Sequence, residues 1–110
     1  MPIYRFIPVQ DEPEVSIRDW SIREVTGGNR SDKTQHIVGY IASRNSGRVT
    51  SAIQLFDRAK MCITTNSGRL YYLVGPPGFN PGIEHVWLNW KIRNQIREEV
   101  DVTNQYWRLH

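Results

Sequence analysis

The chain has 110 residues, of which 23% are charged and 11% are aromatic. This length and composition predict one compact domain spanning residues 1–110 and exclude a wholly disordered protein. The single cysteine, Cys62, excludes an internal disulfide and a zinc site built from cysteines. No apolar run approaches the roughly 18 residues that cross a bilayer, and the first eight residues do not show the charged-then-apolar pattern of a secretory leader. We therefore expect a cytoplasmic protein without a membrane partner.

The net charge of +3 is unevenly distributed along the chain. Residues 27–97 carry +7, and the two flanking segments together carry −4. Eleven of the 14 basic residues are arginine, which suits bidentate contacts with phosphate or carboxylate groups. A basic middle of this size is also common on ordinary solvated surfaces.

The first half of the chain alternates between strand-like and loop-like segments. Residues 2–9 are rich in Ile, Tyr and Phe and predict a strand. Residues 15–25 keep one apolar phase up to Ile17 and another from Trp20, so we expect a bulge or break near Arg18 and Asp19. Residues 27–33 form the most loop-like stretch. Residues 34–43 predict a central strand covered on both faces, with Gly39 at a bulge or close backbone approach.

Three segments between residues 48 and 74 alternate clearly in polarity and are joined by short turns. Connections this short require antiparallel neighbours, so we expect a three-stranded meander. The buried residues expected in this meander and in the following helix are Val49, Ile53, Leu55, Ile63, Leu70, Tyr72, Val74, Val86, Trp87 and Trp90.

Residues 81–94 predict the main helix. Asn80 is suited to cap it, Pro81 fits its first position, and Glu84 lies near the positive end of its dipole. Apolar residues then recur at helical spacing on one side. After Trp90 this phase changes, which favours an end near residues 94–97 over a continued helix with a new buried side.

The segments beyond the helix complete the predicted fold. Residues 100–103 should be extended, as in an edge strand, and Tyr106 and Trp107 should anchor the tail on the body. The fold class is therefore α+β: an antiparallel β-meander sheet of about five or six strands with one main α-helix packed on one face.

No motif in the sequence predicts catalysis or a bound cofactor or metal. The segment Gly75-Pro-Pro-Gly78 resembles a phosphate loop, but it lacks the Gly-Lys pair and its prolines offer no N–H donors. The histidines have no partner at metal-ligand spacing. Cys62 lies in a strand with no cation beside it in the sequence, which favours a packing role.

Basic and aromatic residues in the sheet region provide the only candidates for contact with a macromolecule. Rings on a sheet can stack on bases while arginines contact phosphates, although neighbouring strand residues point to opposite faces. The candidates for macromolecule contact are Arg48, Arg58, Lys60, Arg69, Tyr71, Tyr106 and Trp107.

Three functions remain open from the sequence. We favour a small non-enzymatic binding protein, an inhibitor, adaptor or self-associating subunit, that acts on another macromolecule, most simply a protein. The alternative is a nucleic-acid-binding domain that uses the basic, aromatic sheet region. The second alternative is a small enzyme that joins His36 or His85 to an acid such as Glu84 or Asp57. Homo-oligomerisation is compatible with each.

Overall fold

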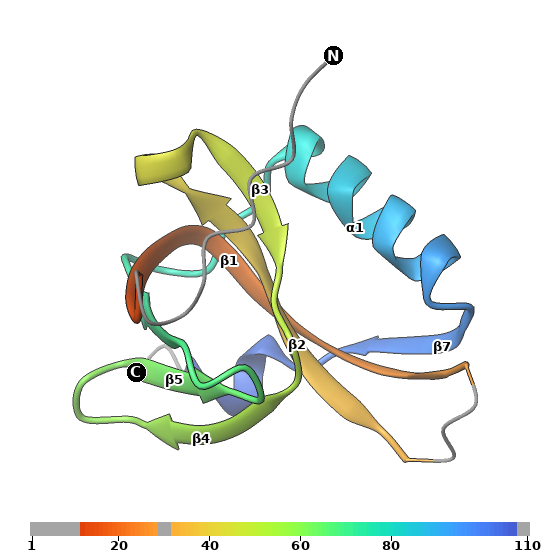
Figure 1. Ribbon diagram of the computed structural model, residues 1–110, viewed down its shortest axis with the longest axis horizontal. Coiled ribbons are helices and arrows are strands. Elements are labelled where there is room, and N and C mark those ends of the chain that lie inside the picture. The colour runs from red at the N-terminus through yellow and green to blue at the C-terminus, as the bar shows by residue number, and fades with distance from the viewer. Residues whose placement is uncertain (1–11, 29–31, 108–110) are drawn as a thin grey trace.

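The computed structural model describes residues 12–28 and 32–107, so the strand predicted for residues 2–9 lies outside the described residues. The described part forms seven strands, one α-helix and two short 3-10 turns (Figure 1). In chain order the elements are β1 (Glu14–Gly27), β2 (Thr34–Ile41), η1 (Ala42–Arg44), β3 (Ser46–Val49), β4 (Ile53–Asp57), β5 (Cys62–Thr65), β6 (Leu70–Leu73), α1 (Pro81–Arg93), β7 (Ile96–Asp101) and η2 (Thr103–Gln105).

The long strand β1 joins two halves of the sheet. Its first residues pair in parallel with β6, which continues to β5 and β4. Its later residues lie between β2 and β7, antiparallel to both, and β3 adds to the far side of β2. The predicted α+β class is confirmed. The sheet, however, has seven strands and a parallel pair, so the prediction of a purely antiparallel meander of five or six strands is wrong.

The predicted meander is present only in part. Strands β4, β5 and β6 are successive antiparallel neighbours, as expected. The strand predicted to begin at Arg48 is instead divided into β3 and β4. Thr50 lies at the division, where its N–H donates to the Ile37 oxygen and its hydroxyl accepts from the Ile37 N–H, each at 3.0 Å. These bonds hold Thr50 on β2, and the chain then passes to the other half of the sheet.

A bulge in β1 confirms the change of phase expected near Asp19. The pairing of β1 with β2 shifts between Arg18 and Ser21, and Asp19 has a φ of 49°. The extra residue lets side chains on both sides of the bulge face the same core. Ile17 and Trp20 are both fully buried there.

The strands and the helix enclose two apolar layers. The larger layer lies between the two halves of the sheet and contains Trp20, Ile22, Ile37 and Ile63. The smaller layer lies between α1 and the β1–β2–β3 part of the sheet, where Val25, Val38, Ile83 and Trp87 pack together. Figure 1 shows α1 and the β4–β5 hairpin on opposite sides of β2. The expectation that β2 is covered on both faces is therefore confirmed.

The expected core of the meander is partly wrong. Ile63 and Trp87 are buried, and Leu55 and Val74 are exposed. Strand β6 buries Tyr71 and Leu73 in place of the expected Leu70, Tyr72 and Val74. The remaining expected core residues, Val49, Ile53, Leu70, Tyr72, Val86 and Trp90, are half-buried.

The helix agrees with its prediction, and the tail agrees in part, because the edge strand β7 covers Ile96–Asp101 instead of residues 100–103 and Thr103 lies in η2. Asn80 Oδ1 accepts a hydrogen bond from the Gly82 N–H at 2.8 Å, and α1 ends at Arg93. The chain then turns into the edge strand β7. Tyr106 is buried, and the Trp107 ring meets the Trp20 ring edge-on at 6.2 Å. No helix within the described residues has the length and apolar character needed to span a membrane.

Candidate functional site

Several residues predicted to contact a macromolecule are internal supports. Arg69 and Tyr71 are only 4% and 3% exposed. The Arg69 Nε–H donates to the Glu12 backbone oxygen at 2.9 Å. Arg48 is half-buried and donates from Nη1 to the Tyr71 hydroxyl at 3.2 Å. The structure thus brings Arg48 and Tyr71 together, but it uses them to join β3 and β6.

The other predicted contact residues lie apart from this pair. Tyr106 is buried and its hydroxyl donates to Gln35, while Trp107 is half-buried against the core. Arg58 and Lys60 are exposed in the β4–β5 turn, and Arg58 Nη2 donates to the Gln105 oxygen at 3.1 Å. These seven residues therefore do not form one continuous exposed surface.

Two of the groups considered for an enzyme site, His36 and Glu84, already have protein partners. His36 is buried, with Nδ1 2.8 Å from the Thr50 oxygen and Nε2 2.8 Å from Thr34 Oγ1. Because a carbonyl oxygen only accepts, Nδ1 carries a proton. Glu84 is paired with Arg23, and His85 is exposed on α1.

A cavity of about 510 Å³ lies beneath the C-terminal half of α1. We call it the helix–sheet cavity. Its volume lies within the range typical of small-molecule sites. It is lined by Val25, Gly27, Gly28, Asp32, Thr34, His36, Val49, Thr50, Ser51, Ala52, Asn66, Trp90, Asn94 and Ile96.

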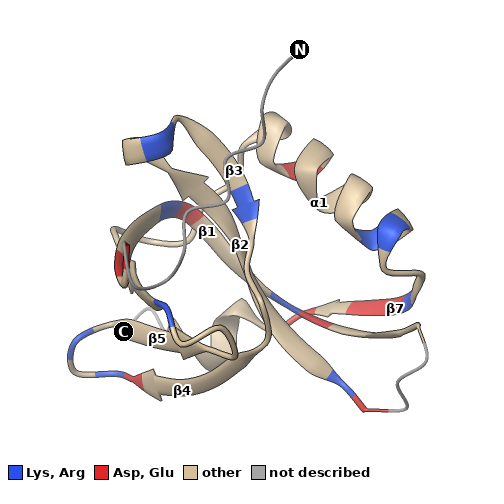
Figure 2. Ribbon diagram, viewed as in Figure 1, with Lys and Arg blue, Asp and Glu red and all other residues tan. Residues whose placement is uncertain are grey.

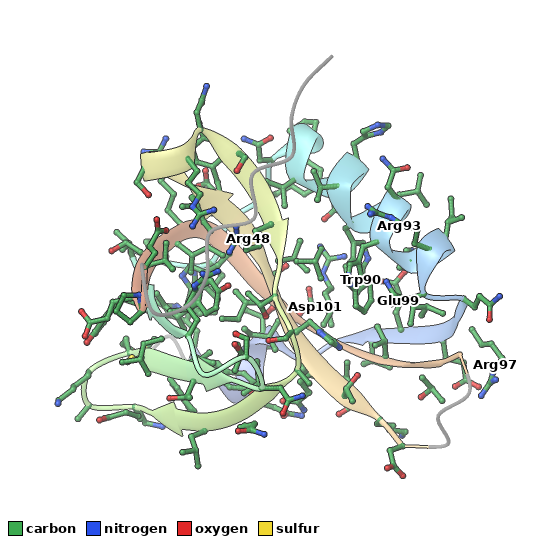
Figure 3. All side chains as sticks on the ribbon, in the orientation of Figure 1. Arg48, Trp90, Arg93, Arg97, Glu99 and Asp101 are labelled. Carbon is green, nitrogen blue, oxygen red and sulfur yellow. The ribbon has the colours of Figure 1, made fainter. Side chains whose placement is uncertain are left out.

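Aromatic rings form one wall of this cavity. Trp90 stacks on Trp87 with ring centroids 5.3 Å apart and planes at 11°. The His36 ring lies 4.7 Å from the Trp90 ring, at 56°. Figure 3 shows Trp90 extending from α1 into the space beside the sheet. The Thr34 and Thr50 contacts hold His36 in place, so this wall is fixed before any ligand enters.

Amide side chains contribute polar groups to the same cavity. Asn94 Nδ2 donates to the Trp90 oxygen at 2.9 Å, and Asn66 Oδ1 accepts from Gln54 at 2.7 Å. Within the described part of the chain, Asn94 Oδ1 and Asn66 Nδ2 have no protein partner. These two amides therefore offer an acceptor and a donor of hydrogen bonds to a ligand, in addition to the polar groups of Asp32 and Ser51 in the lining.

Comparisons with family models, curated proteins and solved structures find no match to this chain. The candidate sites therefore depend on the geometry of this molecule alone. Across residues 12–28 and 32–107, no three His, Cys, Asp or Glu side chains gather to hold a metal ion.

A cluster of charges ties α1 to β1 and β7 beside the cavity. Arg23 pairs with Glu84 on α1 and lies 3.7 Å from Glu99 Oε2 on β7. Glu99 also accepts from the Trp87 Nε1–H at 2.9 Å and pairs with Lys91. Partial burial raises the pKa of Glu99, but the hydrogen bonds from Lys91 and Trp87 outweigh it and hold the pKa below its ordinary value.

The outer side of α1 carries a second candidate surface. Leu88 and Ile92 are 49% and 68% exposed, one turn apart. Together with β7 they border a shallow groove of about 250 Å³. We call this surface the α1–β7 face; its residues are Leu88, Lys91, Ile92, Ile96, Arg97, Glu98 and Glu99.

Sequence reasoning missed both surfaces. The cavity combines residues from β1, β2, the β3–β4 connection, the β5–β6 turn and α1, and no local motif reports such a combination. The change of phase at Ile92 did signal the outer side of α1. In the sequence alone, this change of phase indicates only where the helix ends.

Proposed function

We propose that this protein is a small non-enzymatic binding protein that docks an extended segment of another protein on the α1–β7 face. The observation that carries the proposal is the exposed pair Leu88 and Ile92 beside an edge strand. Exposed apolar residues that adjoin a groove and are bordered by charges are typical of protein contact surfaces. Figure 2 shows the acidic strand β7 directly beside the basic C-terminal end of α1.

The backbone of β7 supports docking of a strand. Val102 donates its N–H to the Ile22 oxygen at 2.9 Å, and Arg23 lies opposite Asp101. Bonded and non-bonded pairs alternate along an antiparallel ladder. Glu99 and Asp101 therefore direct their N–H and C=O groups away from β1. Among the described residues no strand pairs with this outer edge, so an incoming strand meets free donors and acceptors.

The charges of β7 favour a foreign strand over a second copy of this chain. Strand β7 carries the three acids Glu98, Glu99 and Asp101 and the one base Arg97, so two paired copies would each bring a net charge of −2 to the shared edge. Like charges directly opposite one another destabilise a sheet, and acids on an edge protect it from self-pairing. A partner segment with Lys or Arg at alternate positions and apolar residues facing α1 fits this surface. This makes an adaptor or inhibitor a better proposal than a self-associating subunit.

A peptide selection tests the proposal. Random peptides displayed on phage are selected against the protein, and the Kd of each winner is measured by fluorescence polarisation. We expect basic, extended peptides whose binding falls about tenfold or more with Leu88→Asp. Leu55→Asp is the matched control, because Leu55 is similarly exposed but lies on β4. Peptides that bind both variants equally well would refute the α1–β7 face as the docking surface.

A further inference from the structure

The helix–sheet cavity is a separate feature from the α1–β7 face. The space between a helix and a sheet is normally filled by apolar side chains at high density. Here it is bordered by the small residues Gly27, Gly28, Ser51 and Ala52 and by polar groups. A ligand that occupies this solvent-open space would stabilise the folded chain through binding.

We propose that the helix–sheet cavity binds an uncharged nucleobase that carries an exocyclic amine beside a ring nitrogen, as adenine does. A flat heteroaromatic ring gains contact with the aromatic wall of Trp90 and His36. Stacking of a base on an aromatic side chain is favourable for every base. Trp87 already holds the Trp90 ring, and Thr34 and Thr50 already hold the His36 ring. These two side chains therefore lose little conformational entropy when a ligand binds.

The polar groups of the cavity select the edge of the base. Asn94 Oδ1 accepts from an exocyclic amine, and Asn66 Nδ2 donates to a ring nitrogen. In DNA recognition one asparagine amide makes both contacts, to the amine and to the ring nitrogen of adenine; here Asn94 and Asn66 would divide them. Inosine, which carries an oxygen in place of the amine, leaves Asn94 Oδ1 facing another acceptor.

The charges at the cavity indicate which part of a nucleotide enters. Among the described residues that line the cavity, Asp32 is the charged one, and its carboxylate disfavours an anionic phosphate beside it. Outside, Arg97 Nη1 donates to the Gly28 oxygen at 3.4 Å, and Figure 3 shows its side chain directed away from Trp90. A base inside the cavity thus fits either a free nucleoside or a single strand whose phosphate reaches Arg97.

The test uses titrations of the full chain with adenosine, inosine and glucose, followed by calorimetry and by the Trp90 indole NMR signal. We expect saturable binding of adenosine that shifts the Trp90 signal, and about tenfold weaker binding of inosine. Asn94→Ala and Asn66→Ala should each weaken adenosine binding about fivefold, the effect of one hydrogen bond. Asn89→Ala is the control, because Asn89 is exposed on α1 and does not line the cavity.

The outcomes separate support from refutation. Absence of saturable binding by both adenosine and a short single-stranded oligoadenylate would overturn the proposal, as would equal affinity for adenosine and inosine or preference for glucose. Equal effects of Asn94→Ala, Asn66→Ala and Asn89→Ala would also overturn it. Binding of the oligoadenylate alone, weakened by salt and by Arg97→Ala, would support the cavity with a nucleic-acid strand as the source of the base.

Discussion

Replacement of Trp87 by alanine should remove the main support of α1. Trp87 is 1% exposed and packs with Val25, Val38 and Ile83 beneath the helix. Loss of a buried tryptophan costs about 3–5 kcal/mol, from lost transfer free energy and the cavity left behind. The same change removes the N–H that binds Glu99, which adds about 1 kcal/mol. The expected decrease in the free energy of unfolding is therefore about 4–6 kcal/mol.

Urea denaturation followed by circular dichroism measures this loss. A domain of this size is stable by only about 5–15 kcal/mol, so Trp87→Ala is expected to lower the midpoint strongly or to unfold the chain. Trp87→Phe provides a graded second measurement, because it keeps an aromatic ring beside Trp90 and loses the donor to Glu99. Leu88→Ala is the matched control, since its side chain is half exposed, and it should cost less than about 1 kcal/mol.

A small effect of Trp87→Ala would refute the packing argument. A loss below about 1.5 kcal/mol, comparable to the Leu88→Ala control, would mean that α1 does not depend on Trp87 for its position. The comparison remains informative if Trp87→Ala fails to fold. In that case Trp87→Phe should still show a measurable decrease in the free energy of unfolding, with a slope against urea concentration similar to that of the unchanged chain.

Three further predictions concern other supports of the fold. Glu99 has a folded-state pKa below its ordinary value of 4.5, so its contribution to the free energy of unfolding is complete above pH 4.5 and is lost as the pH falls through the lowered pKa. In an acid titration, Glu99→Gln should therefore lose less stability over this pH range than the unchanged chain. Gly27→Ala places Cβ 2.6 Å from the Gln95 oxygen and should cost about 1–3 kcal/mol in urea denaturation. Asn80→Ala removes the cap of α1 and should cost about 1 kcal/mol in thermal unfolding.

The helix and the bulge were predictable because their signals are local. Asn80 and Pro81 mark the start of α1 through backbone chemistry that operates within one turn. The bulge at Asp19 could be predicted from the sequence because the apolar residues before and after it are out of step by one position, although both sets face the same core. Each signal depends on neighbours in the sequence and needs no knowledge of the distant strands.

The buried side of β6 was not predictable in this way. Leu70, Tyr71, Tyr72 and Leu73 are consecutive apolar or aromatic residues, so alternation alone allows either side to be buried. The choice is made by the parallel pairing with β1, where Tyr71 lies opposite Val15 and Leu73 opposite Ile17. That partner is more than 50 residues away, and its pairing has no signature within β6.

The same long-range pairing explains why the predicted contact residues did not gather on one surface. Arg69 and Tyr71 are close in sequence to exposed turns, which suggested an accessible basic patch. Pairing with β1 instead directs Tyr71 into the core and brings Arg69 onto the Glu12 backbone. Burial of an arginine requires several hydrogen bonds, and the sequence around Arg69 does not show where these partners lie.

The helix α1 contributes residues to both proposed sites, and the distribution of its apolar residues supports the proposal of two separate sites. A helix whose only role is to cover a sheet keeps one apolar side and one polar side. In α1 the inner side places Trp90 at the helix–sheet cavity, whereas the outer side exposes Leu88 and Ile92. Because these residues lie on opposite sides of one helix, Ile92→Asp should weaken peptide binding and leave adenosine binding unchanged. Asn94→Ala should have the reverse effect, so the two proposals can fail separately.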